Sequence, residues 1–395
     1  YNAGTSVTTG LRNNLLGGLA GDALTDGNDN VAIGYQALTA DQQGDNSVAI
    51  GVNALFTQNG TNGSVYNVAV GKSAGFAITT GLQNTLIGGL AGDALTDADN
   101  NIAIGYGALS ADTLGSTSIG IGVLALAEQN FTTATDVYNV AIGFRAGEKV
   151  TTGIENTIIG ALTGDALTEG GLNVAVGASA LGVDTKGSRN VAVGVSALNQ
   201  QNFTTATTSY NTGVGYQAGG AVTTGIQNTL IGALAGDALT DADFNVAVGI
   251  AALSSDTLGS RSTAIGDNAL AAQNFTTATN TYNTAVGFNA GLAVTTGVQN
   301  TLVGGLAGGA ITTGQNNVSL GAFSLDAEVA GNKSIAIGTY ALSGQSSATS
   351  TDVYNTAVGH SAGQSVTTGT LNTLIGGLAG DALTVGNSNV AMGYG

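Results

Sequence analysis

A five-residue motif, seen for example at Asn139, Val140, Ala141, Ile142 and Gly143, recurs 22 times along the 395-residue chain. Each copy closes on a glycine, and every fourth interval between these glycines is longer, as in the series Gly71, Gly88, Gly105, Gly122 and Gly143. A short, regular period of this kind is typical of solenoids, in which each repeat is one structural coil. The sequence therefore predicts 17/17/17/21-residue coils, combined into a 72-residue super-repeat.

The residues within the motif favour an extended strand. The position three residues before the glycine is Val, Ile or Thr in 21 of the 22 copies, and the position directly before it is always aliphatic. β-Branched residues at alternate positions favour strands, and the 64 glycines disfavour helix. The predicted fold class is all-β: a parallel β-solenoid, or β-roll, of about 22 coils. We expect two short strands and two turns in each coil.

Both faces of the repeated strand are apolar, which predicts burial on both sides. A coil this thin cannot cover both faces by itself, so three chains are expected to pack around an axis as a homotrimeric fibre. On this basis Ile142 is expected to be buried and Asp165 to be a surface charge. Residues 1–395 are expected to form one continuous shaft, and because the sequence starts and stops within a coil, we interpret it as a window of a longer repetitive chain.

Composition excludes several function classes. With 25 acidic against 8 basic residues, the net charge of −17 argues against nucleic acid or an anionic membrane as a partner. No apolar run has the length of a membrane helix, so no membrane insertion is expected. The chain has no cysteine and a single histidine, His360, and its carboxylates repeat with the array instead of converging. We therefore expect no catalytic residues, no cofactor and no enzyme activity.

The residue that opens the strand is Asn in 18 copies and Ser in four. Stacked Asn side chains form hydrogen-bonded ladders in cross-β arrays, which makes a structural ladder the favoured interpretation and a ligand site the alternative. The predicted ladder includes Asn67, Asn84, Asn101, Asn139, Asn156, Asn173, Asn211, Asn228 and Asn245.

Acidic turns in every fourth coil allow two interpretations. Carboxylates from neighbouring turns can supply the several oxygen ligands that Ca²⁺ requires, or they can be solvated charges that keep a fibre soluble. The second interpretation is favoured, because the acidic residues are replaced in some super-repeats and do not match a calcium-binding nonapeptide. The residues concerned are Asp93, Asp97 and Asp99, with their counterparts Asp237, Asp241 and Asp243.

The long connection of the fourth coil contains aromatic residues at constant phase. Its four extra residues are expected to leave the coil and protrude. Either the aromatic side chains fold back to cover gaps, or the loops provide lateral contacts for sugars or neighbouring fibres. The possible lateral contacts are Phe131, Tyr138, Phe203, Tyr210, Phe275 and Tyr282.

Two known repeat types resemble this sequence across essentially the whole chain. Residues 67–71 with Ser73 and Ala74, and residues 47–51 with Ala54, resemble the head repeats of trimeric autotransporter adhesins. That resemblance implies a left-handed, trimeric, parallel β-roll displayed outside the cell. The longer patterns at residues 30–38 and 215–225 are more similar to repeats of bacteriophage tail fibres. The 17-residue coil and the 72-residue super-period depart from the adhesin pattern.

These features favour a structural role. The expected function is the shaft of a phage tail fibre, which extends a receptor-binding element for host attachment. The alternative is a bacterial surface adhesin or extracellular filament of the trimeric autotransporter type. Either would be extracellular, on a virion tail or a cell surface, with itself and possible host-surface glycans or a receptor as partners. A polysaccharide-degrading tail spike stays open for a complete protein that contains this segment.

Overall fold

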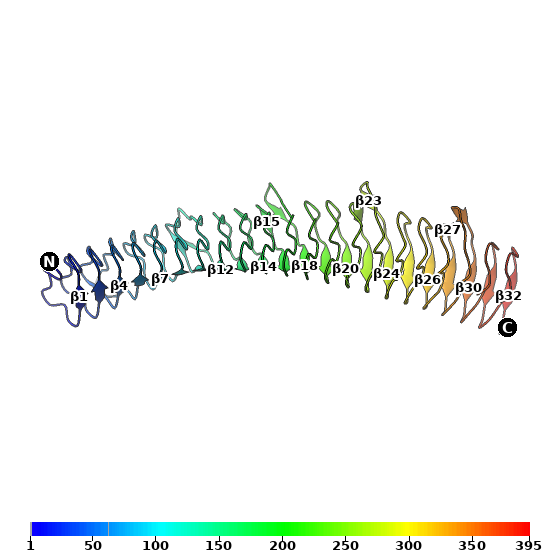
Figure 1. The fold of residues 1–395 in the computed structure, drawn as a ribbon, viewed down its shortest axis with the longest axis horizontal. Coiled ribbons are helices and arrows are strands. Elements are labelled where there is room, and N and C mark those ends of the chain that lie inside the picture. The colour runs from blue at the N-terminus through cyan, green and yellow to red at the C-terminus, as the bar shows by residue number, and fades with distance from the viewer. Residues whose placement is uncertain (1, 62) are drawn as a thin grey trace. The chain divides into compact units, whose positions relative to one another are not determined.

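The computed structural model describes residues 2–61 and 63–395, and in this part of the chain every regular element is a β-strand. The strands are parallel and belong to successive coils, so the predicted all-β, parallel β-solenoid is confirmed (Figure 1). The described residues fall into two compact units. The first comprises the residues up to Val193 with Asn202–Thr208, and the second comprises Gly194–Gln201 with Ser209–Gly395.

In the first unit, each coil contributes one three-residue strand to a parallel ladder. Residues at equivalent positions of consecutive coils are direct partners, as Val140, Ala141 and Ile142 are with Thr157, Ile158 and Ile159. The strands, in ladder order, are β1 (Asn14–Leu16), β2 (Val31–Ile33), β4 (Val48–Ile50), β6 (Val68–Val70), β7 (Thr85–Ile87), β8 (Ile102–Ile104), β10 (Ile119–Ile121), β12 (Val140–Ile142), β13 (Thr157–Ile159), β14 (Val174–Val176) and β16 (Val191–Val193).

The second unit repeats this arrangement with the same register. Its ladder consists of β18 (Thr212–Val214), β19 (Thr229–Ile231), β20 (Val246–Val248), β22 (Thr263–Ile265), β24 (Thr284–Val286), β25 (Thr301–Val303), β26 (Val318–Leu320), β28 (Ile335–Ile337), β30 (Thr356–Val358), β31 (Thr373–Ile375) and β32 (Val390–Met392). One continuous shaft through both units stays a prediction.

We number the four coils of a super-repeat so that the coil with the long connection is the fourth. Within the described residues, a second strand is present only in the third and fourth coils. The expectation of two strands per coil is therefore wrong for the first and second coils. These strands have two residues each and pair with one partner. The pairs are β3 (Gly44–Asp45) with β5 (Gly63–Ser64), β9 (Gly115–Ser116) with β11 (Thr135–Asp136), β15 (Gly187–Ser188) with β17 (Thr207–Thr208), β21 (Gly259–Ser260) with β23 (Thr279–Asn280), and β27 (Gly331–Asn332) with β29 (Thr351–Asp352).

The core of each coil is built from small and aliphatic side chains. In β12 the middle residue, Ala141, points inward and is fully buried, and so is Ala146, which follows in the next turn. The chain segment around Ala146 is a turn and contains no strand. The interior is therefore only one or two side chains wide, which explains why Ala recurs at both positions.

At the position four residues after the strand glycine, two coils with Leu are followed by two coils with Gly. In the fourth coil type Leu126 is buried in a left-handed conformation, with φ of 52°, and the next coil has Gly147 at the equivalent position, with φ of 57°. A Cβ on Gly147 would lie 3.0 Å from Ile158 Cδ1 and 3.2 Å from Leu126 Cδ2. Ile158, the bulky middle residue of β13 in the next coil, therefore fills the space that Gly147 leaves.

One burial prediction needs correction and another stays a prediction. The side chains of Val140 and Ile142 flank the inward-pointing Ala141 and point away from the coil; Ile142 is 37% exposed in the single chain, so its burial depends on the predicted trimer. Asp165, predicted to be a surface charge, is only partly exposed, and burial raises the pKa of its carboxyl group. Because the coil interior has room for one side chain per strand, the flanking residues cannot be covered by their own chain.

The strand-ending glycines leave no room for a side chain, and this generates a test of the stacking. Gly143 has φ of 140°, and a Cβ there would overlap with the carbonyl oxygen of Gly160. We expect Gly143→Ala to lower the free energy of unfolding by about 2–4 kcal/mol. The control is Gly305→Ala, where a Cβ would have no neighbour within 4 Å. Chemical denaturation measures both; equal midpoints would contradict this account.

Candidate functional site

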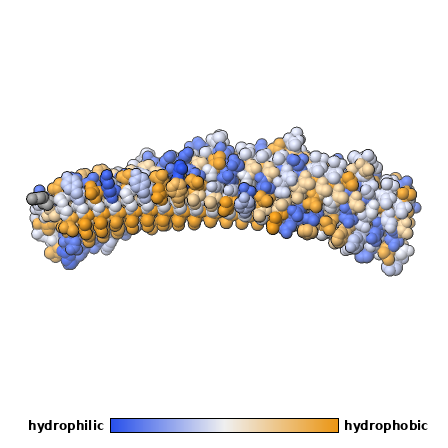
Figure 2. Space-filling model, viewed as in Figure 1, coloured by the Kyte–Doolittle hydropathy of each residue, from blue (hydrophilic) through white to orange (hydrophobic). Residues whose placement is uncertain are grey.

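The first candidate site is an exposed apolar stripe along the strand ladder. We define the apolar stripe as the first and third residues of the three-residue strands of the first unit, from β2 to β16. Their side chains point out of the coil, and Ile33, Ile87 and Ile159 are each 37% exposed. Figure 2 shows a row of hydrophobic side chains along the strand edge of this unit. None of the strands in the ladder contains a charged residue.

The stripe is flanked by exposed aromatic residues directly after the strand glycines. Tyr35, Tyr106 and Phe144 occupy this position in the first unit and are more than half exposed. In the second unit, Thr replaces Val or Ile as the first residue of seven of the eleven strands in the ladder, so the corresponding surface is less apolar. A row of aliphatic side chains edged by aromatic ones has the composition of a protein interface core.

The second candidate site is the predicted Asn ladder, whose nine Asn side chains are all fully buried. Asn139 Oδ1 accepts a hydrogen bond from the backbone N–H of Asn156 at 2.9 Å, and Asn156 Oδ1 accepts one from Asn173 at 3.1 Å. Each Nδ2 donates to a turn carbonyl 14 residues further on, as Asn139 does to Gly153 at 2.8 Å. The same pattern includes Asn67, Asn84, Asn101, Asn211, Asn228 and Asn245. These contacts satisfy backbone and amide groups inside the coil, and they leave no polar surface for a ligand.

A buried carboxylate and a buried glutamine bridge the ladder where Ser replaces Asn, and sequence reasoning missed both. Gln129 Nε2 donates to Asp112 Oδ2 at 2.6 Å and to Ser118 Oγ at 2.9 Å, while Gln129 Oε1 accepts from Asn139 Nδ2 at 2.9 Å. Asp112 Oδ1 also accepts the backbone N–H of Phe131 at 3.0 Å. The carboxylate therefore fixes the start of the long connection.

The same network occurs in other super-repeats. In the second unit Asp256 and Gln273 take these roles, and further along Glu328 replaces the Asp and still accepts a hydrogen bond from Gln345 Nε2, at 2.6 Å. The signal that could have identified the pair is its 72-residue spacing: Gln129, Gln273 and Gln345 lie at one phase. An acidic residue and a glutamine at fixed phase in an array with few charges indicate a buried pair.

The six predicted contact residues of the long connections fall into two groups that differ in exposure. Phe131, Phe203 and Phe275 are at most 8% exposed, so they pack back onto the coil and cannot make lateral contacts themselves. The tyrosines Tyr138, Tyr210 and Tyr282 are more than half exposed. The connections that contain β17, β23 and β29 protrude in Figure 1, beside the labels β15, β23 and β27, as expected from their extra residues.

The acidic residues of the turns accept hydrogen bonds from the preceding coil. Asp97 accepts a hydrogen bond from Thr80 Oγ1, and Asp99 Oδ1 accepts one from the backbone N–H of Leu82 at 2.7 Å. Asp241 and Asp243 accept equivalent bonds from Thr224 and Ile226. Across residues 2–61 and 63–395, no three His, Cys, Asp or Glu side chains come close enough to share a metal ion.

Asp93 and Asp237 differ from the other acidic residues of these turns in the burial of their carboxyl groups. Burial raises the pKa of both carboxyl groups, and Oδ1 of each is buried without a hydrogen-bond partner. Burial also raises the pKa values of Asp41, Asp165 and Asp326. These groups are stabilised in their protonated form by the folded chain.

His360 lies beside Tyr340, with 6.4 Å between the ring centroids, and packs as an aromatic side chain. Within the described residues, no helix has the length and apolar character that a membrane crossing requires.

No family model matches the chain, and no curated protein matches it.

The bridging glutamine generates a stability prediction. We expect Gln129→Ala to lower the free energy of unfolding by about 2–4 kcal/mol, because it removes the hydrogen bonds of Gln129 to Asp112 Oδ2 and to Asn139 Nδ2 inside the coil. The control is Glu128→Ala on the exposed neighbouring side chain, with an expected change below about 0.5 kcal/mol. Denaturant unfolding followed by circular dichroism measures both. An unchanged free energy of unfolding in Gln129→Ala would show that the bridge does not contribute to stability.

The raised pKa values generate a pH prediction. A carboxyl group whose pKa is higher in the folded than in the unfolded state binds protons more tightly when folded, so stability falls as the pH rises through that value. Five partly or largely buried Asp residues have raised pKa values. Among the described residues, lowered carboxyl pKa values occur only at Asp29 and Asp352, which pair with Arg12 and Lys333. We expect the melting temperature to rise as the pH is lowered from 7 towards the unfolded-state Asp pKa of about 3.9, and this acidification also relieves part of the net negative charge. Replacing Asp93, Asp165 and Asp237 by Asn should flatten this slope; a melting temperature that falls on acidification would contradict the prediction.

Proposed function

We propose that the chain is the shaft segment of a homotrimeric extracellular fibre, of the phage tail-fibre type, that extends a receptor-binding element towards a host surface. The observation that carries the proposal is the apolar stripe. A shaft needs length, stiffness and a means of self-association, and its repeats need no catalytic group.

The extent of the stripe supports self-association. Monomeric soluble proteins rarely expose contiguous apolar patches of more than a few hundred Å². The first unit has ten strands from β2 to β16, each with two outward-pointing side chains. A stable interface buries about 800 Å² per partner with about 20–30 residues on each side, and the stripe alone contributes two side chains from each of ten strands.

The spacing of the stripe supports a second and third copy of the same chain as the partners. Equivalent residues recur in register at each rung, about 4.8 Å apart. A partner that contacts the stripe over many rungs must present side chains at the same interval, and an identical chain does so. The absence of charged residues from the strands removes the repulsion that the net charge of −17 would otherwise cause.

The type of fibre is inferred from the repeats. The longer coils at residues 30–38 and 215–225 are similar to phage tail-fibre repeats, which favours a virion tail. The alternative, a surface adhesin of the trimeric autotransporter type, is favoured by the Ser or Asn, Val, Ala, Ile, Gly pattern at residues 47–51 and 67–71. Both assign the same mechanical role to this chain.

Light scattering tests the trimer. We expect a molar mass three times the 38.4 kDa of one chain. Replacing Val140 and Ile142 together by Asp should weaken association at least tenfold, because six carboxylates would meet in an apolar interface. The same two charges added as Thr132→Asp and Thr133→Asp, on exposed loop residues, should leave the mass unchanged. A stable, soluble monomer at micromolar concentration would overturn the proposal, as would equal effects of the two variants.

A further inference from the structure

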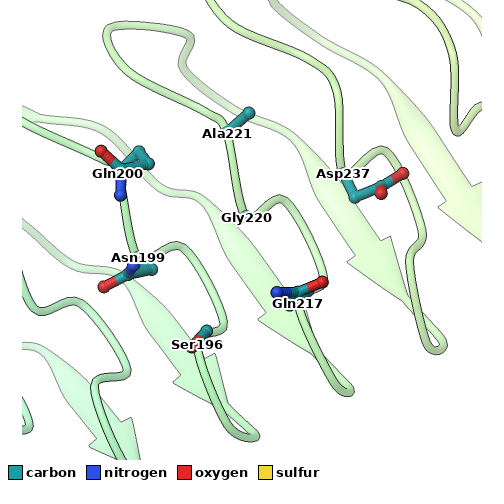
Figure 3. Close-up of a pocket in the computed structure, with 7 residues that line it drawn as sticks. All are labelled: Ser196, Asn199, Gln200, Gln217, Gly220, Ala221 and Asp237. Carbon is teal, nitrogen blue, oxygen red and sulfur yellow. The ribbon is translucent and has the colours of Figure 1, made fainter.

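A polar hollow lies on the turns of three consecutive coils in the second unit. It has a volume of about 240 Å³. Ser196, Asn199 and Gln200 line it from the first coil, Gln217 from the second and Asp237 from the third (Figure 3). The coils are held together here by backbone hydrogen bonds, including that from the Gln200 N–H to the Gly220 carbonyl oxygen at 3.2 Å, so the lining is fixed by the solenoid.

The hollow exists because Gly220 has no side chain. This position is five residues after a strand-ending glycine, and the corresponding positions in the other super-repeats are Phe76, Glu148, Leu292 and Gln364. In the first unit the side chains at this position make contacts within the chain: Phe76 stacks on Phe56 with 5.0 Å between ring centroids, and Glu148 pairs with Arg145. The hollow described here lies at the super-repeat that has Gly at this position.

Most polar side chains around the hollow form no hydrogen bond within the described part of the protein. Among the described residues, the side chains of Ser196, Asn199, Gln200 and Gln217 have no hydrogen-bond partner. Asp237 Oδ1 is buried and also lacks a partner. Three carboxamides offer both donors and acceptors, the hydroxyl offers either, and the carboxylate offers acceptors.

The chemistry of the lining selects the class of ligand. No Lys or Arg lines the hollow, and the chain is strongly acidic, which disfavours an anionic ligand. A single carboxylate is too few for Ca²⁺, which takes six to eight oxygen ligands. A neutral molecule with several adjacent hydroxyl groups matches alternating donors and acceptors, and a hexose ring has a size that such a hollow accommodates.

We propose that this hollow binds a neutral hexose unit of a saccharide, with Asp237 accepting hydrogen bonds from its hydroxyl groups and Gln217 and Asn199 donating and accepting at the others. The site goes beyond the shaft role and stands on the geometry of one chain alone. It gives the fibre one lateral saccharide contact at a defined super-repeat.

The test measures binding of neutral methyl hexosides by saturation-transfer NMR and titration calorimetry, with the full chain. For a ligand of this size we expect a Kd on the order of 1 mM. Gly220→Leu fills the hollow with the residue that Leu292 supplies in the next super-repeat, and it should weaken binding at least tenfold without changing the melting temperature. Asp237→Asn should weaken it to a lesser extent.

The matched control is Gln364→Leu, which makes a similar change at the corresponding position of another super-repeat and should leave Kd unchanged. Hexuronates should bind more weakly than neutral hexosides. The proposal is overturned if the wild-type chain gives no saturable response to any methyl hexoside, if Gly220→Leu binds as the wild type does, or if CaCl₂ alone saturates the site. None of these outcomes bears on the trimer, which light scattering tests separately.

Discussion

Hydrogen bonds between corresponding residues of successive coils determine almost everything else in this structure. In-register stacking requires that each position of the coil be compatible with itself one rung above and below. At the strand-ending glycines, exemplified by Gly143 with its neighbour Gly160, the backbones approach too closely for any side chain. The buried Asn ladder meets the same requirement with a polar group, because each amide both donates and accepts along the stack. The motif is repeated because the geometry at each rung is the same.

The narrow interior has a functional consequence. Each strand can bury only its middle residue, so the flanking Val and Ile side chains, such as Val140 and Ile142, are left on the surface. What would be a liability in a monomer becomes, in our proposal, the means by which identical chains align. The hollow at Gly220 illustrates the complementary principle: on a rigid, repetitive scaffold, a single missing side chain is enough to create a distinct site.

The periodicity of the sequence is sufficient to predict the coil, the strand and its residues, because each repeat is an independent observation of the same structure. The surroundings of individual side chains are harder to predict from the sequence. The pattern does not distinguish a side chain inside its own coil from one that points out of it, so the sequence leaves open whether Ile142 is covered by its own chain or by a partner. The roles of Asp112 and Gln129 escape sequence reasoning because they join residues from two coils at a point where the ladder residue changes to Ser. The hollow depends on the absence of a side chain at Gly220, which no motif signals.

Because the chain contains no cysteine, single cysteines can map the face that meets a second copy. The most direct measurement is inter-chain disulfide formation under mild oxidation, comparing Val140→Cys in the apolar stripe with Thr133→Cys in the protruding connection. A disulfide requires Cβ atoms within about 4.5 Å, so it reports only residues that meet across the interface. Our account predicts rapid cross-linking from Val140→Cys and little from Thr133→Cys. Cross-linking from Thr133→Cys alone, or from neither residue, would contradict the assignment of the stripe as the self-association surface.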